Sequence, residues 1–249
     1  MESLVVVKLG GSLIKNIEVL NRFFREAVIV SRNRYIILVH GGGAEIGMLL
    51  KKFGIVSKFI GGLRFTDIAT LEVAEMVLSG KVNRFLTTGL IKNGANAVGI
   101  SGKDGKSIIC KQIKNLGFVG IPSKINKKLI NVLMKAGFLP VIAPIAADSY
   151  GNVMNVNADT LASSIAASFK AQKLIFLTDV VGVLDKNKDV IQEIKINEIN
   201  NLIKDQTITG GMIPKIKACA VSVRSGVREV WIANGIFGII DMKGTLVKR

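Results

Sequence analysis

An α/β fold built on a largely parallel sheet is the fold class that this sequence predicts. Short apolar runs of strand length alternate with longer stretches of helical periodicity along the 249 residues. Such alternation is typical of a parallel sheet covered by helices on both faces. Glycine pairs and triplets follow the apolar runs, as at Gly10-Gly11 and Gly41–Gly43, where a strand must turn into the next helix. We therefore expect a three-layer α/β/α sandwich with two lobes.

The expected strands are the short apolar runs, and the expected helices are the stretches with a 3.6-residue apolar period. Stretches in which glycine alternates with other residues are expected to form hairpins. The first part of the chain is read, in order, as strand Leu4–Leu9, helix Ile17–Ser31, strand Tyr35–Val39, a helix ending near Phe53, a long helix Thr66–Lys92, strand Ala97–Ile100, a hairpin over 105–120, helix Ile125–Ala136, strand Leu139–Ala143 and a hairpin over Ala147–Met154. The remainder is read as helix Asn157–Phe169, strand Lys173–Leu177, helices near Lys195–Lys204 and Gly211–Ser225, and strand Glu229–Ala233. The lobes are expected to be 1–170 and 171–249, within one continuous fold.

Composition excludes several classes of protein. A hydrophobic fraction of 49% with only 4 prolines excludes disorder, and the uninterrupted apolar stretches are too short for a membrane span. The net charge of +16 is dispersed, so we expect no nucleic-acid partner. Two distant cysteines and a single histidine favour a reducing compartment and exclude a multi-histidine zinc site. With no basic leader segment at the start, we expect a cytoplasmic protein.

Two glycine turns follow predicted strands. Lys8 precedes Gly10 and Gly11, whose backbone N–H groups are suited to oxyanions. Taken alone, this pattern is more often a tight turn. His40 precedes Gly41–Gly43, and ligands of open α/β sheets bind at such carboxyl ends of strands. His40 itself is interpreted as a packed or hydrogen-bonded residue rather than a catalyst.

Two further stretches carry groups suited to an amino-acid ligand. Arg64, just before a predicted helix, can hold a carboxylate through two parallel hydrogen bonds, although a surface arginine beside an N-cap at Thr66 or Asp67 is the simpler reading. Asn155 and Asn157 point to the same side of an extended segment, and Asp159 falls in the first turn of the next helix. These last three also fit an ordinary capped helix start.

The last two stretches lie in the final third of the chain. The segment Leu177–Leu184 leaves a predicted strand through a glycine turn, and Lys215 follows the glycine pair Gly210-Gly211 near a helix start. A lysine in that place is able to reach a phosphate. Each of the six stretches is weak evidence by itself.

As a set, the six stretches resemble the amino acid kinase family, and within it the members that phosphorylate N-acetyl-L-glutamate. The resemblance runs from Val5 to about Thr245 and rests on the motifs KLGG, HGGG, GLRFTD, MNVNAD, LTDVVGVL and TGGMIPK, in this order. It implies the amino acid kinase fold and transfer of the γ-phosphoryl group of ATP to the side-chain carboxylate of the acceptor, a step of arginine biosynthesis. It also implies Mg²⁺ that arrives with ATP and is held mainly by phosphates and water.

The resemblance assigns a role to each matched position. Catalytic roles are implied for Lys8, Lys215, Asp159 and Gly11. Binding of the acceptor is implied for Gly42, Gly43, Arg64, Asn155 and, as a weaker candidate, Asn157. Binding of the nucleotide is implied for Gly10, Asp179, Val180, Val181, Gly182, Val183, Leu184, Thr207, Ile208, Thr209 and Gly211.

Within that scheme, Lys8 and Lys215 stabilise the transferred phosphoryl group from the two lobes, and Asp159 holds both lysines. Gly11 donates its N–H to phosphate oxygens, Arg64 pairs with the α-carboxylate, and Asn155 fixes the acetamido group. A carboxylate acceptor is already a nucleophile at neutral pH, so no general base is required. Catalysis then depends on positioning and on charge stabilisation.

Two other functions remain open on the same fold. One is a sister kinase that acts on aminoadipate or glutamate attached to a carrier protein, which the positive charge would suit. The other is a non-catalytic amino-acid-sensing or nucleic-acid-associated protein, which should have lost at least one of Lys8, Lys215 and Asp159. Arginine-inhibited relatives carry an N-terminal helix that links dimers into hexamers. Only seven residues precede Lys8 here, so the resemblance also leads us to expect an arginine-insensitive homodimer.

Overall fold

The computed structural model describes residues 3–249 and divides by contacts into two compact units. The first unit combines 3–36 with Ala162–Arg249, and the second is Ile37–Leu161. This division differs from the expected lobes 1–170 and 171–249. The physical reason is that β1 (Leu4–Leu9) pairs in parallel with β11 (Lys173–Thr178), so the start of the chain packs with its last third.

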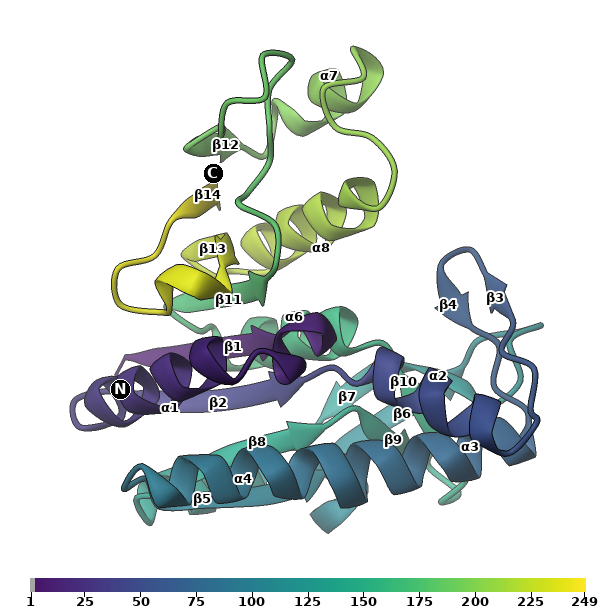
Figure 1. The fold of residues 1–249 in the computed structure, drawn as a ribbon. Helices are drawn as coiled ribbons and strands as arrows, with labels where there is room; N and C mark the ends of the chain where they lie inside the picture. Colours follow the sequence, from purple (N-terminus) through teal and green to yellow (C-terminus); the bar gives the residue numbers. More distant parts are fainter. Residues whose placement is uncertain (1–2) are drawn as a thin grey trace. The chain divides into compact units, whose positions relative to one another are not determined.

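The first unit is built on a mostly parallel group of strands (Figure 1). Strand β11 lies between β1 and β13 (Glu229–Asn234), parallel to both, whereas β14 (Gly244–Lys248) runs antiparallel to β13. The short β12 (Glu193–Lys195) pairs in parallel with β14. The β1–β11 register brings Lys8 opposite Phe176, which becomes important for the candidate site.

Helices of the first unit are amphipathic and bury one face. They are α1 (Ile17–Ser31), α7 (Ile199–Lys204), α8 (Met212–Arg224) and most of α6 (Ala158–Phe169). The Asn16 side chain caps α1 by accepting a hydrogen bond from the N–H of Val19 at 3.1 Å. Phe23 of α1 is fully buried, and α8 packs on β13 and β14. Burial of these aromatic and aliphatic faces is the main stabilising term.

The second unit contains a parallel group of strands, a long helical rod and a small barrel. Strand β8 (Leu139–Ala143) lies between β2 (Tyr35–His40) and β5 (Ala97–Ser101), parallel to both. Helices α2 (Gly43–Lys52) and α5 (Lys127–Lys135) follow β2 and precede β8. A two-stranded ribbon, β3 (Phe59–Ile60) with β4 (Leu63–Arg64), stands apart from these strands.

The barrel closes through four short strands, in the order β10-β7-β6-β9 within the described residues. Both hairpins expected from the sequence belong to it. Strands β6 (Ile108–Gln112) and β7 (Val119–Ile125) pair antiparallel, as do β9 (Ile145–Ala147) and β10 (Val153–Val156). Parallel pairing of β10 with β7 joins the two hairpins. Asn155 is thereby fixed on β10.

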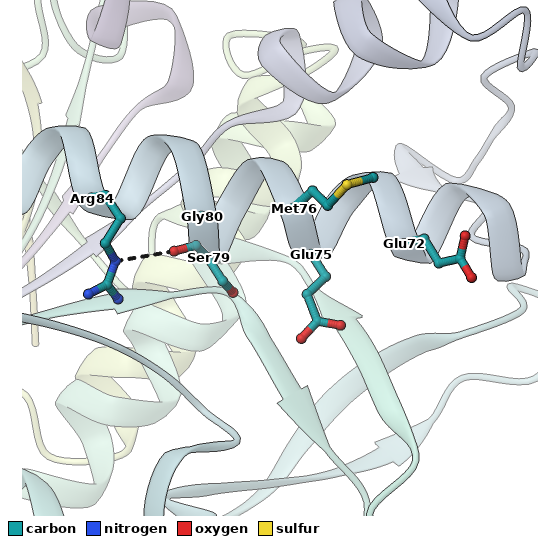
Figure 2. Close-up of a pocket in the computed structure, with 6 residues that line it drawn as sticks. All are labelled: Glu72, Glu75, Met76, Ser79, Gly80 and Arg84. Carbon is teal, nitrogen blue, oxygen red and sulfur yellow. Dashed lines mark hydrogen bonds between the residues drawn. The ribbon is translucent and has the colours of Figure 1, made fainter.

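The helical rod follows the predicted stretch Thr66–Lys92 closely. It consists of α3 (Ile68–Glu75), a π-helical segment Met76–Val82 and α4 (Asn83–Lys92), with α4 packed on β5 and β8. Its outer face carries a shallow hollow of about 700 Å³, shown in Figure 2 and lined by Glu72, Glu75, Met76, Ser79, Gly80 and Arg84. The sequence pattern contained no signal for the π-helical register.

The predicted α/β class with a largely parallel sheet is confirmed. Four strands were missed by the prediction: β3, β4, β12 and β14. Each is only two to five residues long, too short to show a repeating apolar pattern. Among residues 3–249, no helix combines the length and the apolar character needed to cross a membrane.

Candidate active site

The turn after β1 is held tightly against the end of β11. The N–H of Gly10 donates a hydrogen bond to the carbonyl oxygen of Leu177 at 2.8 Å, and a Cβ on Gly10 would lie 3.0 Å from that same oxygen. Gly11 then opens a 3-10 turn, Gly11–Lys15, without a side-chain cap. The close approach of two backbones therefore explains why glycine stands at position 10.

Lys8 and Lys215 lie near the same aromatic ring. Lys8 is the register partner of Phe176 in the parallel pair β1–β11, and such partners project from the same face of a sheet. The Nζ atom of Lys215, from the first turn of α8, lies 5.7 Å from the centre of the Phe176 ring. Residues 207 positions apart in the sequence are thus brought together within one unit, not one from each lobe as we expected.

Asp179 adds a carboxylate to this group. Burial raises the pKa of Asp179, but hydrogen bonds from the side chains of Thr178 and Ser12, its own backbone N–H and the positive charge of Lys215 together hold that pKa below its usual value. The Thr178 hydroxyl donates to the carboxylate at 3.0 Å. Asp179 is therefore ionised at neutral pH and lies within the electrostatic reach of Lys215.

The turn after β11 combines exposed and buried apolar residues. Val180, Val181 and Leu184 are 37–44% exposed, whereas Val183 is buried and donates its N–H to the Thr245 hydroxyl at 2.8 Å. Gly182 has a φ of 140°, and a Cβ there would lie 2.8 Å from the same hydroxyl oxygen. The turn is thus anchored on one side and offers apolar side chains on the other.

The Thr207–Gly211 segment leads into α8. The N–H of Thr207 is bound by the Asp205 carboxylate at 3.0 Å, and Ile208 is buried. Gly211 stands at the N-cap position of α8 with no side chain to cap it. The N–H groups of Met212 and Ile213 already donate to the carbonyl oxygens of Thr209 and Gly210 at 3.2 Å, and Pro214 has no N–H. The start of α8 therefore offers an anion the positive charge of Lys215 rather than free N–H groups.

In the second unit, the turn after β2 starts α2 in the same way. Gly42 is its N-cap and offers no side-chain hydrogen bond. A Cβ on Gly42 would lie 2.6 Å from Cδ2 of the buried Leu78, so a larger residue there would force the Leu78 side chain to move. The helix N-terminus that follows at Gly43 is favourable for a carboxylate.

Arg64 reaches this turn from β4. Its Nη2 atom donates to the carbonyl oxygen of Gly43 at 2.9 Å, its Nη1 atom donates to the Ser57 hydroxyl, and its guanidinium lies 4.7 Å from the centre of the Phe59 ring. Partial burial holds the pKa of Arg64 below its usual value, yet it stays charged at neutral pH. The structure therefore brings Arg64 and Gly43 together.

Asn155 joins the same group through Thr66. Its Nδ2 atom donates to Oγ1 of Thr66 at 3.2 Å, and that hydroxyl donates to the carbonyl oxygen of Arg64 at 2.9 Å. Thr66 is fully buried. Of the two N-cap candidates, Asp67 is the one that caps α3, accepting from the N–H of Thr70 at 2.8 Å.

Asn157 and Asp159 stand at the start of α6. The Asn157 Oδ1 atom accepts from the N–H of Thr160 at 3.0 Å, so this side chain acts as the helix cap. Asp159 lies in the first turn of α6, where its negative charge is stabilised by the helix dipole. Their roles toward substrate and lysines remain predictions.

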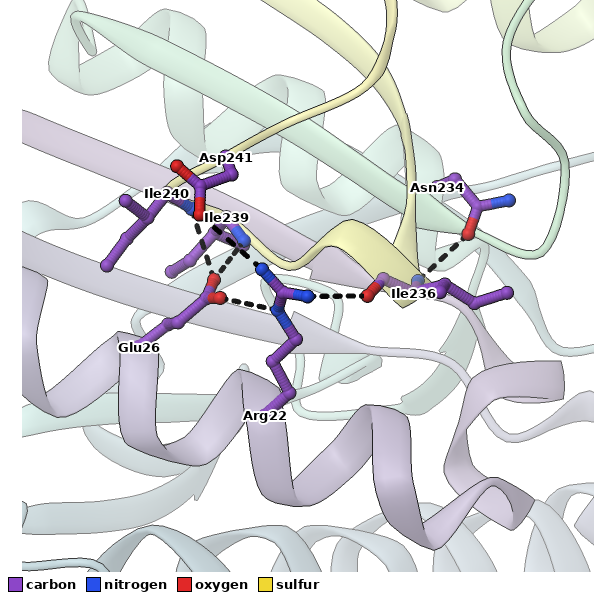
Figure 3. A network of polar contacts seen from close by, with 7 residues as sticks. All are labelled: Arg22, Glu26, Asn234, Ile236, Ile239, Ile240 and Asp241. Atoms are coloured by element: carbon purple, nitrogen blue, oxygen red, sulfur yellow. Dashed lines mark hydrogen bonds and ion pairs between the residues drawn. The ribbon is translucent and has the colours of Figure 1, made fainter.

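Several residues that hold these segments in place carry no signal in the sequence. The Asn234 Nδ2 atom donates to the carbonyl oxygen of Asp179 at 3.3 Å, and its Oδ1 atom accepts from the N–H of Ile236. The segment after Asn234 is hydrogen-bonded to α1, as Figure 3 shows. The Glu26 carboxylate of α1 accepts hydrogen bonds from the N–H groups of Ile239 and Ile240 and from the Nε–H of Arg22. Gly238 allows this approach, because a Cβ there would lie 2.0 Å from the Glu26 carboxylate. The contacts of Asn234 with Asp179 and of Glu26 with Ile239 and Ile240 join residues far apart in the sequence, so no local pattern indicates them.

The sequence model of the amino acid kinase family matches residues 3–234. This chain belongs to that family. The resemblance inferred from the six motifs is thereby confirmed. Since 3–234 includes nearly all the residues described above, the family membership applies to both units.

Curated relatives in the family match nearly all of this chain. Acetylglutamate kinase from Endomicrobium trichonymphae is 67% identical over 249 residues, covering 100% of both chains. Acetylglutamate kinase from Mesorhizobium japonicum is 42% identical over 246 residues, covering 93% of this chain and 83% of the relative.

Solved structures agree on the amino acid kinase fold. The protein smu.665 from Streptococcus mutans UA159 superposes with a TM-score of 0.89 at 28% identity, covering 100% of this chain and 99% of that one. Giardia carbamate kinase gives a TM-score of 0.75 at 16% identity, covering 99% of each chain, which speaks for the fold alone.

Proposed function

We propose that this chain is an acetylglutamate kinase, which transfers the γ-phosphoryl group of ATP to the side-chain carboxylate of N-acetyl-L-glutamate for arginine biosynthesis. The full-length relative at 67% identity bears that activity in its name. Within the molecule, the observation that carries the proposal is the gathering of Lys8, Phe176, Asp179 and Lys215 beside two uncapped glycine turns. The two ammonium groups and the N–H groups of the turn at Gly11 suit a triphosphate, and Asp179 offsets part of the positive charge.

Charge stabilisation by the first unit is the core of the proposed mechanism. Negative charge spreads over the oxygens of the phosphoryl group as it leaves ATP. Lys8 and Lys215 would offset that charge, and the N–H of Gly11 would donate to it, so the barrier falls without any proton transfer. We propose that the exposed Val180, Val181 and Leu184 contact the adenosine, because the side chains of Val183 and Ile208 are buried.

Recognition of the acceptor falls to the second unit. Arg64 would exchange its hydrogen bonds to Gly43 and Ser57 for a bidentate pair with the α-carboxylate. The Asn155 amide, held by Thr66, would bind the acetamido group. The start of α2 at Gly42 and Gly43 would receive the reacting carboxylate, which is ionised at neutral pH and therefore already a nucleophile.

Mg²⁺ is proposed to enter with the nucleotide. Its preferred ligands are oxygens, and it usually retains several waters, so phosphate oxygens and water would supply most of its coordination. Among residues 3–249, no group of three or more His, Cys, Asp or Glu side chains is placed to hold a metal ion. We assign no protein ligand to it.

A homodimer in the cytoplasm completes the proposal. Cys110 and Cys219 are both free and buried, and burial raises the pKa of the Cys110 thiol to about 12, so it stays protonated and unreactive. These thiols suit a reducing compartment. The surface that we propose for the dimer is the hollow of Figure 2.

The decisive experiment traps the acyl phosphate product with hydroxylamine in the presence of Mg²⁺ and ATP. The acceptors to compare are N-acetyl-L-glutamate, free glutamate, and glutamate or aminoadipate attached to a carrier protein. We expect hydroxamate with acetylglutamate only. Turnover of the carrier-bound acceptor alone would assign the chain to the sister kinases, and no turnover with any of them would contradict the proposed function.

A further inference from the structure

The single histidine of the chain lies directly before the glycine turn of the proposed acceptor site. His40 ends β2 and is fully buried. Its Nδ1 atom lies 2.8 Å from the carbonyl oxygen of Gly41, and its Nε2 atom lies 3.3 Å from Nδ2 of Asn83. The proposed mechanism makes no use of this side chain.

The two contacts fix the proton of the imidazole. A carbonyl oxygen only accepts hydrogen bonds, so Nδ1 carries the hydrogen and donates it to Gly41. An amide nitrogen only donates, so Nε2 accepts from Asn83. Burial lowers the pKa of His40 to about 4, although the bond to Gly41 favours the charged form. The ring is therefore neutral at physiological pH, in one tautomer, with a defined direction of donation.

Asn83 is itself rigidly placed. It is fully buried at the first position of α4, and its Nδ2 atom donates to the carbonyl oxygen of Val141 on β8 at 2.9 Å. On the other side it packs on Gly99 of β5, where a Cβ would lie 2.0 Å from the Asn83 Oδ1 atom. The partner of His40 is thus bound to two neighbouring strands and has no freedom to follow the ring.

Two further contacts join the helical rod to the same glycine turn. Leu78 contacts Gly42, as described above, and Lys81 pairs with Glu45 in the first turn of α2 at 2.7 Å. The turn Gly41–Gly43 is therefore held from one direction by the rod and from the other by Arg64. Three glycines in succession have little conformational preference of their own, so their geometry must come from such contacts.

We propose that His40 and Asn83 are positioning residues, which orient the Gly41 carbonyl and thereby aim the N–H groups at the start of α2 toward the reacting carboxylate. This inference rests on the proposed function, because it assigns the turn to the acceptor. It predicts that the Nδ1–H bond to Gly41 is the important one. Loss of that bond should weaken acceptor binding and turnover but leave nucleotide binding alone.

Two substitutions separate the ring nitrogens. His40→Asn places an amide N–H where Nδ1 stands and keeps the donor to Gly41, whereas His40→Gln reaches only the Nε2 position. We expect His40→Asn to keep kcat/KM for acetylglutamate within about fivefold of the wild type. His40→Gln should lose at least tenfold, with KM for ATP unchanged within about twofold. Equal losses in the two variants, or a loss confined to ATP, would overturn the inference.

A control variant tests whether a loss of folding stability alone explains the kinetic effect. Thr87→Val removes a buried hydroxyl that donates to the backbone carbonyl of Asn83 at 2.8 Å, away from the glycine turn. Its Tm should fall as in the histidine variants, while its KM for acetylglutamate stays at the wild-type value. If Thr87→Val raised that KM as much as His40→Gln, the effect would be one of general stability and the positioning role would be refuted.

A ligand-free measurement keeps this inference separate from the proposed function. Amide hydrogen exchange over Gly41–Gly47 should be faster in His40→Gln than in His40→Asn, because only the former frees the Gly41 carbonyl. Equal exchange rates would refute the positioning role even in an active kinase. A wild type without acyl phosphate formation would refute the function, while the exchange rates still decide on the turn.

Discussion

Lys8 and Lys215 are the residues on which the proposed chemistry depends most. Each should contribute to charge stabilisation in the transition state rather than to folding. We expect Lys8→Ala and Lys215→Ala to lower kcat by about 10²–10³, or roughly 3–4 kcal/mol, as for loss of one oxyanion donor. The exposed Lys217 of the same helix α8 provides the control, and Lys217→Ala should keep full activity. Initial rates with saturating substrates, together with unchanged circular dichroism, make the comparison, and activity within about threefold of wild type in either variant contradicts the assignment.

His40 makes stability depend on pH in a defined direction. Its pKa is about 4 in the folded chain against 6.5 in the unfolded chain, so below pH 6.5 the unfolded state binds a proton that the native state does not. The free energy of unfolding therefore has its full value above pH 6.5 and falls as pH drops toward 4, by about 2 kcal/mol at pH 5.

Chemical denaturation at pH 7 and pH 5 tests that dependence. The pH effect of other groups is common to wild type and His40→Asn, so the stability difference between them is the quantity to follow. It should shift by about 2 kcal/mol in favour of the variant on going from pH 7 to pH 5. A constant difference would show that the imidazole is solvated rather than buried.

At the level of elements, Gly117 decides whether β4 and the barrel fit together. Its φ is 68°, and a Cβ there would lie 2.2 Å from the carbonyl oxygen of Thr66, which accepts the N–H of Phe118 at 2.6 Å. Gly137 also has a positive φ, 81°, but no atom within 4 Å of its would-be Cβ. Alanine substitutions at Gly137 and Gly117 therefore distinguish the cost of backbone strain alone from the cost of strain together with a steric clash.

We expect Gly137→Ala to cost about 1–2 kcal/mol from the left-handed backbone alone. Gly117→Ala should cost at least about 2 kcal/mol more, since the conflict is with backbone that cannot rotate away. Because Thr66 also holds Asn155, KM for acetylglutamate should rise in Gly117→Ala only. Urea unfolding and steady-state kinetics measure both effects, and equal costs would argue against the close contact.

Most helices and strands were predicted from local pattern, because the apolar periodicity of these segments matches the secondary structure that they adopt. The helix Ile17–Ser31 was predicted with both its ends from its apolar periodicity, and the strand Leu4–Leu9 was equally clear. Strand β14 was missed because its order comes from pairing with β13 rather than from its own five residues. The π-helical segment Met76–Val82 was missed because it is fixed by packing, at Leu78 on Gly42.

The same limit of local sequence pattern applies to the candidate site. Motifs gave Arg64, Asn155 and the glycine turns, since these residue types stand at strand ends. The same motifs pointed to Thr66 only as an N-cap candidate and gave no indication of Ser57, although the hydroxyls of both contact these side chains. A supporting hydroxyl has no sequence signature, because its value lies entirely in the neighbour that it reaches.

At the scale of the whole chain, the expected lobes followed residue order, whereas the compact units combine segments that are far apart in the sequence. Pairing of β1 with β11 places Lys8 in the same compact unit as Lys215, so the residues assigned to the nucleotide and both lysines share one unit. The residues assigned to the acceptor, such as Arg64 and Asn155, share the other. In the proposed function each unit would therefore serve one substrate, a division by non-local strand pairing that residue order does not reveal.

The rod α3–α4 presents the surface that we propose for the homodimer. Glu72, Met76 and Gly80 recur every four residues along its outer face, so they form one stripe of the hollow in Figure 2. Gly80 has no atom within 4 Å of its would-be Cβ, which lets a second helix approach closely. In a two-fold pair of antiparallel rods, Glu72 of one copy would face Arg84 of the other, because a self-complementary surface needs opposite charges at its two ends.

A charge placed in the stripe should separate the copies, whereas the same charge elsewhere on the rod should not. Met76 and Ile91 are 52% and 53% exposed on the same rod, but only Met76 lines the hollow. We expect Met76→Glu to halve the mass measured by light scattering, because it would bury an unpaired carboxylate in the interface. Ile91→Glu should leave a dimer. A dimeric Met76→Glu protein, or a monomeric wild type, would show that this face of the rod is not the site of self-association.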